Sequence, residues 1–126
     1  MISLENRRAV IVEDDEWFAE QLATIMKKQG MSCQVASFAD EAIAKIDTHL
    51  PDVILLDMLL TGSTGLVLLH ELQSHDDLAR IPVIVCSATA DMLEQPMLAA
   101  YGVRRVIDKT TMHPDDVLAA VRSVLA

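Results

Sequence analysis

Carboxylates, one hydroxyl and one ammonium stand at the ends of short apolar runs in this sequence, and these side chains could do chemistry. They belong to Glu13, Asp14, Asp57, Ser87 and Lys109. In open α/β sheets, ligands bind in the crevice outside the carboxyl ends of the strands, so residues at strand ends are the first candidates for a site. Crowded carboxylates raise one another's pKa unless a cation intervenes, and an all-oxygen set of this kind suits Mg²⁺. The pattern indicates a place where a metal ion and an anionic group are held against Asp57.

Phosphoryl transfer depends mainly on positioning and on the neutralisation of charge, and this set of side chains supplies both. Taken singly, each group has a simpler explanation. The acidic run at 13–15 could cap a helix, where carboxylates are favoured by the helix dipole. Ser87 could be an ordinary turn residue, and Lys109 a solvated surface lysine. We favour a joint site because all of these groups fall at the ends of predicted strands.

Five runs rich in β-branched residues predict the strands, at 9–13, 33–37, 52–57, 82–87 and 104–108. Their continuous apolar character is typical of parallel strands that are covered on both faces. Segments with helical spacing follow each run, with Gly30 and Gly102 as expected helix stops. The predicted apolar stripes are Phe18, Leu22, Ile25 and Met26; Ala39, Ile43 and Ile46; Leu66, Leu69 and Leu72; Leu93, Met97 and Tyr101; and Val117, Leu118, Val121 and Leu125. Five strand–helix pairs in alternation indicate one α/β domain with an open, doubly wound parallel sheet.

The composition limits the class of protein. The chain has 126 residues, 52% of them apolar and 23% charged, which fits one soluble globular domain. A net charge of −9 argues against a DNA-binding surface. No apolar run reaches the roughly 18 residues that a membrane span needs, and no signal peptide is evident, so we expect a cytoplasmic protein with no membrane contact.

Four features together resemble the receiver domain of bacterial two-component response regulators, over about residues 8 to 125. They are the acidic pair in VIVEDDE, the D-x-x-L-x-x-x-x-G run from Asp57 to Gly65, the pair Ser87-Ala88, and Lys109 after the fifth predicted strand. The resemblance implies a flavodoxin-like (CheY-like) fold, a doubly wound five-stranded parallel sheet in order 2-1-3-4-5. It also implies that residues 1–126 form a single receiver domain with no effector domain in this chain.

The resemblance assigns roles to the candidate residues. Asp57 is expected to accept a phosphoryl group from a histidine kinase or a histidine phosphotransfer protein. Ser87 and Lys109 are expected to bind the phosphoryl oxygens. Such domains catalyse their own phosphorylation and a slow autodephosphorylation, and they act as signalling switches rather than as enzymes with a separate substrate.

The implied metal is Mg²⁺. By the same resemblance Asp14 would be a direct ligand, and Glu13 would act largely through water. Asp57 and the backbone carbonyl of Leu59 would complete the share of the metal shell that the protein supplies.

The expected output surface lies on the fourth helix, the fifth strand and the fifth helix, and it includes Met92, Met97 and the pair Arg104-Arg105. A downstream protein or effector domain would bind there. No direct contact of this domain with nucleic acid is expected, and homodimerisation is left open. The same side chains could also be ordinary packing and solvated charge.

Three positions depart from the usual receiver pattern. Thr61 replaces a common proline, and Val106 stands where an aromatic residue usually reports phosphorylation. Thr110 replaces the proline that usually follows the lysine, so the Lys109–Thr110 bond is expected to be trans. The loss of the aromatic residue keeps one alternative open: a pseudo-receiver that binds proteins independently of phosphorylation. A phosphatase of the haloacid dehalogenase kind is excluded because Leu59 stands where its second aspartate belongs.

Overall fold

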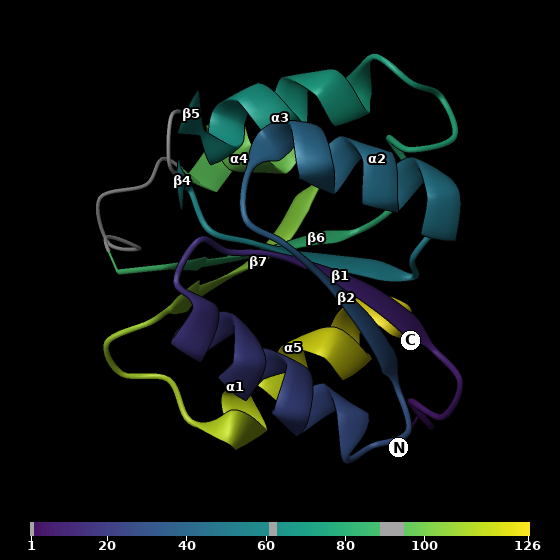
Figure 1. The fold of residues 1–126 in the computed structure, drawn as a ribbon, viewed down its shortest axis with the longest axis vertical. Helices are drawn as coiled ribbons and strands as arrows, with labels where there is room; N and C mark the ends of the chain where they lie inside the picture. Colours follow the sequence, from purple (N-terminus) through teal and green to yellow (C-terminus); the bar gives the residue numbers. More distant parts are fainter. Residues whose placement is uncertain (1, 61–62, 89–94) are drawn as a thin grey trace.

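The computed structural model describes residues 2–60, 63–88 and 95–126. A parallel five-stranded sheet lies between two layers of helices (Figure 1). The elements in chain order are β1 (Arg8–Val12), α1 (Glu16–Lys27), β2 (Ser32–Ala36), α2 (Ala39–His49), β3 (Val53–Leu56), β4 (Leu59–Leu60), β5 (Ser63–Thr64), α3 (Gly65–Gln73), β6 (Val83–Ser87), α4 (Gln95–Ala100), β7 (Val103–Asp108) and α5 (Pro114–Leu125).

The order of the strands in the sheet is β2-β1-β3-β6-β7. This is the predicted order 2-1-3-4-5, because β4 and β5 form a separate two-stranded antiparallel hairpin between β3 and α3. The predicted fold class is therefore confirmed, and each predicted main strand lies within one residue of the observed one at either end. The hairpin was not predicted, since two strands of two residues each leave no periodic signal in the sequence.

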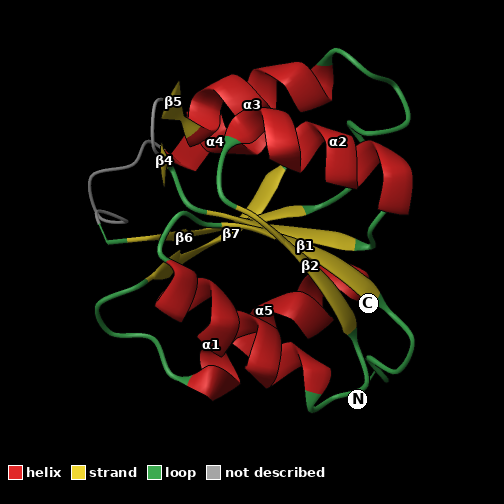
Figure 2. Cartoon of the chain, viewed as in Figure 1, coloured by secondary structure: helices red, strands yellow, loops and turns green. Residues whose placement is uncertain are grey.

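The two faces of the sheet carry separate hydrophobic cores. Helices α1 and α5 cover one face, and α2, α3 and α4 cover the other (Figure 2). Successive residues of the buried strands alternate between them: Val10 and Val12 pack under α2 and α3, whereas Ala9 and Ile11 pack under α1 and α5. This alternation explains the continuous apolar runs, because both faces of each central strand need apolar side chains.

The predicted helix stripes are correct in outline but differ in phase at two helices. On α4, Leu98 is buried and Met97 is exposed, although Met97 was expected on the buried face. Leu93, the first residue of that predicted stripe, lies outside the described residues. On α3, Leu68 is buried and Leu66 only partly so. Short helices allow this error, because a stripe of three residues fits two helix phases almost equally well.

Glycines end two helices as predicted. Gly30 has φ +89 and Gly102 has φ +86, so both occupy the left-handed region that disfavours other residues. Among residues 2–60, 63–88 and 95–126, no helix has the length and apolar character needed to cross a membrane.

Candidate functional site

Backbone hydrogen bonds between strands continue one residue past the strand ends and position the site. The amide of Glu13 donates to the carbonyl of Ala36 at 2.9 Å, and the amide of Asp57 donates to the carbonyl of Val12 at 2.9 Å. The amide of Lys109 donates to the carbonyl of Ser87 at 3.0 Å. Because these hydrogen bonds fix the backbone just beyond the ends of β1, β3 and β7, the side chains meet at one edge of the sheet.

Three carboxylates come together at this edge. Glu13, Asp14 and Asp57 each offer a carboxylate oxygen, and these oxygens lie within 4.8 Å of one another. Asp14 is partly accessible, whereas Glu13 and Asp57 are buried. The predicted acidic cluster is thus present, and its all-oxygen donor set fits a hard divalent cation such as Mg²⁺.

Lys109 supplies the positive charge in the cluster. Its Nζ donates to Asp57 Oδ2 at 3.2 Å and forms an ion pair with Glu13 Oε1. The side chain of Lys109 is 17% exposed, against 2% for Glu13 and 9% for Asp57. One ammonium is therefore shared between two buried carboxylates, an arrangement that offsets part of their desolvation.

The close packing of these charged groups shifts the pKa values of Glu13 and Lys109. Burial raises the pKa of Glu13 to about 7, with Asp57 adding to the rise and Lys109 opposing it. For Lys109, burial disfavours the ammonium, but the hydrogen bond and charge of Glu13, together with Asp57, outweigh it and raise its pKa. Lys109 is therefore an ammonium at neutral pH, whereas Glu13, with its pKa raised to about 7, gains and loses its proton near neutral pH, and a cation bound beside it would favour the ionised form.

The acidic run has two roles. Glu13 and Asp14 belong to the cluster, whereas Asp15 is the N-cap of α1 and its Oδ1 accepts from the amide of Phe18 at 3.1 Å. Glu13 Oε2 also accepts from the amide of Asp15 at 3.3 Å. The helix-cap explanation considered for this run therefore holds for its third residue only.

The other predicted residues are Ser87 and Leu59, which follow or end strands at the same edge of the sheet. Ser87 is buried and ends β6, paired with Asp108 of β7. Leu59 has an exposed side chain, and its amide donates to Asp57 Oδ1 at 3.2 Å. The metal role of the Leu59 carbonyl remains a prediction. Thr61 and Met92 lie outside the described residues.

The departures from the usual receiver pattern have distinct structural settings. The described residues contain no cis peptide bond, so the Lys109–Thr110 bond is trans as expected. Val106 is partly buried against the core under α2, α3 and α4. Tyr101 contacts α3 instead: its hydroxyl lies 3.1 Å from His70 Nε2, and the two rings meet edge to face with centroids 4.5 Å apart.

Sequence reasoning named Phe18 and Gly65 but did not predict their contacts at the site. The ring of Phe18 lies under the ammonium of Lys109, with Nζ 4.5 Å from the ring centroid. Gly65 begins α3, and its amide donates to the carbonyl of Met58 at 2.8 Å. Gly65 was noted as part of a motif, but its close approach to Asp57 was not foreseen.

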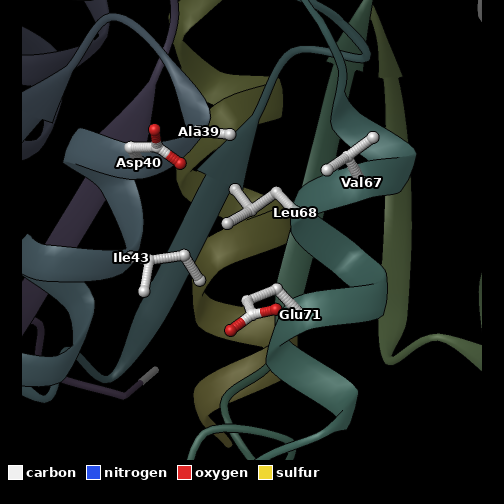
Figure 3. Close-up of a pocket in the computed structure, with 6 residues that line it drawn as sticks. All are labelled: Ala39, Asp40, Ile43, Val67, Leu68 and Glu71. Carbon is white, nitrogen blue, oxygen red and sulfur yellow. The ribbon is translucent and has the colours of Figure 1, made fainter.

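The cavity between α2 and α3 is separate from this site. It has a volume of about 280 Å³ and is lined by Ala39, Asp40, Ile43, Val67, Leu68 and Glu71. Figure 3 shows the carboxylates of Asp40 and Glu71 on facing helices, with Ile43 and Leu68 between them. None of these residues belongs to the acidic cluster.

Comparison with known proteins assigns the family. The family model of the response regulator receiver domain matches residues 9–122. The chain belongs to the response regulator receiver family. The sensory transduction protein RegX3 of Mycobacterium tuberculosis is 28% identical to this receiver domain over 116 residues, which are 92% of this chain and 49% of RegX3. The phosphate regulon transcriptional regulatory protein PhoB of Rhizobium meliloti is 26% identical over 118 residues, 94% of this chain and 52% of PhoB.

A solved structure supports the same assignment. The BeF3-activated N-terminal receiver domain of RstA from Klebsiella pneumoniae is 28% identical to this chain, with a TM-score of 0.78. The match covers 94% of this receiver domain and 98% of that chain. The receiver domain described here spans about half the length of the curated relatives it matches.

Gly65 leads to a prediction about how the loop after Asp57 is packed. A Cβ at residue 65 would lie 2.9 Å from the carbonyl oxygen of Asp57 and 2.9 Å from Met58 Cα. Both atoms are backbone and cannot move without shifting the loop, so Gly65→Ala should destabilise the fold by about 1–3 kcal/mol. Thermal unfolding should show a melting temperature lowered by several degrees.

Val67→Ala provides the matched control for Gly65→Ala. Val67 is exposed on the same helix, so its truncation should change stability by no more than about 0.5 kcal/mol. A Gly65→Ala variant that melts like the wild type would contradict the tight packing of this loop against Asp57.

Proposed function

We propose that this chain is a phosphoacceptor receiver domain of a two-component or phosphorelay system, and that Asp57 takes the phosphoryl group. One observation carries the proposal: Asp57 belongs to the acidic cluster and shares the ammonium of Lys109 with Glu13, at the edge where ligands bind in such sheets. Membership of the receiver family supports it. The donor would be a histidine kinase or a histidine phosphotransfer protein.

In the proposed reaction, an oxygen of Asp57 forms a bond to phosphorus while the bond between phosphorus and the donor nitrogen breaks. Lys109 would leave its ion pair with Asp57 and bind phosphoryl oxygens, which balances the added charge of about −1.5 to −2. The hydroxyl of Ser87 would donate to another phosphoryl oxygen. Because the transferred group passes through a loose transition state, positioning and charge neutralisation are the main contributions of these side chains.

Mg²⁺ is the proposed cofactor, and it would supply charge neutralisation between the carboxylates and the phosphoryl oxygens. Asp14 and Asp57 would bind it directly, Glu13 largely through water, and the carbonyl of Leu59 would complete the protein ligands. The oxygen spacing of the acidic cluster supports this assignment. The raised pKa of Glu13 also fits a site that is completed by a cation.

We propose a signalling switch as the role, with autodephosphorylation slowly resetting it. The output would pass through α4, β7 and α5 to a downstream protein or effector domain, or to a second copy of the chain. Exposed Arg104 and Arg105 on β7 support a polar contact on this face. The net charge of −9 supports the absence of direct nucleic-acid contact, and a cytoplasmic location follows from the proposed donors.

The test is incubation of the protein with Mg²⁺ and acetyl phosphate, followed by measurement of its intact mass. A gain of one phosphoryl group that depends on Mg²⁺ is expected. No gain at saturating donor would contradict the proposal and would favour the alternative of a phosphorylation-independent interaction module.

Trp17 gives a second prediction, which concerns metal binding without phosphorylation. Trp17 lies in the first turn of α1, two residues after the N-cap Asp15, and its side chain is 69% exposed. Binding of Mg²⁺, or of Mg²⁺ with beryllofluoride, changes the charge close to this turn and should alter tryptophan emission in a saturable titration. Na⁺ at matched ionic strength is the control. A flat Mg²⁺ titration would contradict a metal site beside the start of α1.

A further inference from the structure

The ring of Phe18 forms one side of the environment of Lys109. Nζ of Lys109 lies 4.5 Å from the ring centroid, within the range in which a cation is attracted by the negative face of an aromatic ring. Phe18 lies in the first turn of α1, which follows the acidic run at 13–15. No receiver motif in this sequence includes it.

The position of the Phe18 ring is fixed from two sides. Its backbone amide donates to Asp15 Oδ1 at 3.1 Å, so the cap of α1 holds the residue at the third position of the helix. Its side chain is partly buried against the core under α1 and α5. The ring therefore keeps a fixed position beside Lys109, because its rotamer is restricted by packing as well as by the helix.

Among the described residues, the ammonium of Lys109 contacts three side chains. Two are the carboxylates of Glu13 and Asp57, and the third is the face of Phe18. With the lysine side chain only 17% exposed, little water screens these contacts. A leucine at residue 18 would fill similar space but would present no negative face to the ammonium.

We propose that Phe18 is a positioning residue that holds the ammonium of Lys109 beside Asp57 through a cation–π contact. The inference rests on the proposed function, in which Lys109 binds the phosphoryl oxygens. The aromatic face attracts the ammonium without occupying its hydrogen-bond donors. Lys109 can then transfer those donors from the carboxylates to the phosphoryl group while it stays over the ring.

The test compares Phe18→Leu with Phe18→Tyr. Leucine keeps an apolar side chain of similar size and tyrosine keeps the aromatic face, so only the leucine variant loses the cation–π contact. With Mg²⁺ and acetyl phosphate, Phe18→Leu should be phosphorylated about three- to tenfold more slowly, and Phe18→Tyr should stay within about twofold of the wild type. Trp17→Leu removes an exposed aromatic ring at the neighbouring position and should also leave the rate within about twofold of the wild type.

A second measurement detects the contact without metal or phosphoryl donor. Protons above an aromatic face are shifted upfield by the ring current, so the Hε protons of Lys109 should resonate upfield of the other lysine Hε protons. Phe18→Leu should remove this shift, and Phe18→Tyr should retain it. Thermal unfolding of each variant shows whether a changed rate reflects a loss of folding.

The outcomes separate this inference from the proposed function. Wild-type labelling with an unchanged rate in folded Phe18→Leu would overturn the positioning role while leaving the phosphoacceptor proposal intact. Absence of labelling in the wild type would overturn the proposed function, and the Lys109 Hε shift would still decide whether Phe18 holds the ammonium. An Hε shift that is the same in the wild type and in Phe18→Leu would overturn the inference whatever the rates.

Discussion

Asp57→Asn is expected to abolish the gain of one phosphoryl group when the protein is incubated with Mg²⁺ and acetyl phosphate. An amide does not attack phosphorus as a carboxylate does, and the substitution also removes one negative charge from the acidic cluster. The measurement is the intact mass after incubation, taken at several times and at saturating donor.

The fold should survive this substitution. Asn keeps the size of the side chain, and Lys109 retains its ion pair with Glu13. The free energy of unfolding, measured by denaturant titration, should therefore stay close to that of the wild type. A folded Asp57→Asn protein with no mass gain assigns the loss to chemistry rather than to unfolding.

Asp15→Asn is the matched control for the loss of a carboxylate at the same edge. Asparagine caps helices about as well as aspartate, so α1 should begin as before. This variant should be phosphorylated like the wild type. If Asp57→Asn were still labelled while the acidic neighbours were intact, the acceptor would have to be a different residue, and the assignment of Asp57 would be wrong.

The sheet and the acidic cluster could be predicted from the sequence, because both follow from short-range patterns. Residues 53–56 and 83–86 are continuous apolar runs, and parallel strands that are buried on both faces leave that signature. Once the strands are placed, the topology itself brings their carboxyl ends together. Glu13, Asp57 and Lys109 could therefore be grouped without any knowledge of side-chain contacts.

The contact between Phe18 and Lys109 could not be predicted from the sequence in this way. Phe18 was assigned to the apolar stripe of α1, and it does pack against the core. Its second contact depends on the angle at which α1 leaves β1 and on how the side chain of Lys109 crosses the sheet edge. Those quantities are set by packing between residues 91 positions apart, and no local pattern encodes them.

The hairpin β4–β5 and the phase of α4 were missed for a related reason. Two-residue strands have no period to detect, and a helix of six residues has too few turns to define its buried face. For Leu98 the tertiary environment decides which side is buried. Met97 was assigned both to the buried stripe and to the expected output surface. Its 43% exposure contradicts the first assignment and is compatible with the second, which remains a proposal.

Lys109→Met is expected to slow phosphorylation of Asp57 by about 10²-fold to 10³-fold, because loss of one group that stabilises charge in a transition state typically has this effect. Methionine keeps an unbranched, flexible side chain that can pack against Phe18, but it lacks the ammonium shared by Glu13 and Asp57. The rate of mass gain with Mg²⁺ and acetyl phosphate is the measurement.

Two further variants separate charge from geometry at Lys109. Lys109→Arg keeps the positive charge, but its planar fork differs in shape from a compact ammonium, so only part of the wild-type rate should return. Lys45→Met removes a lysine that pairs with Glu41 on α2, away from the acidic cluster, and should leave the rate unchanged. Wild-type rates in Lys109→Met would show that the ammonium has no part in the reaction. A full rate in Lys109→Arg would mean that a positive charge at this position is sufficient and that the shape of the ammonium is not required.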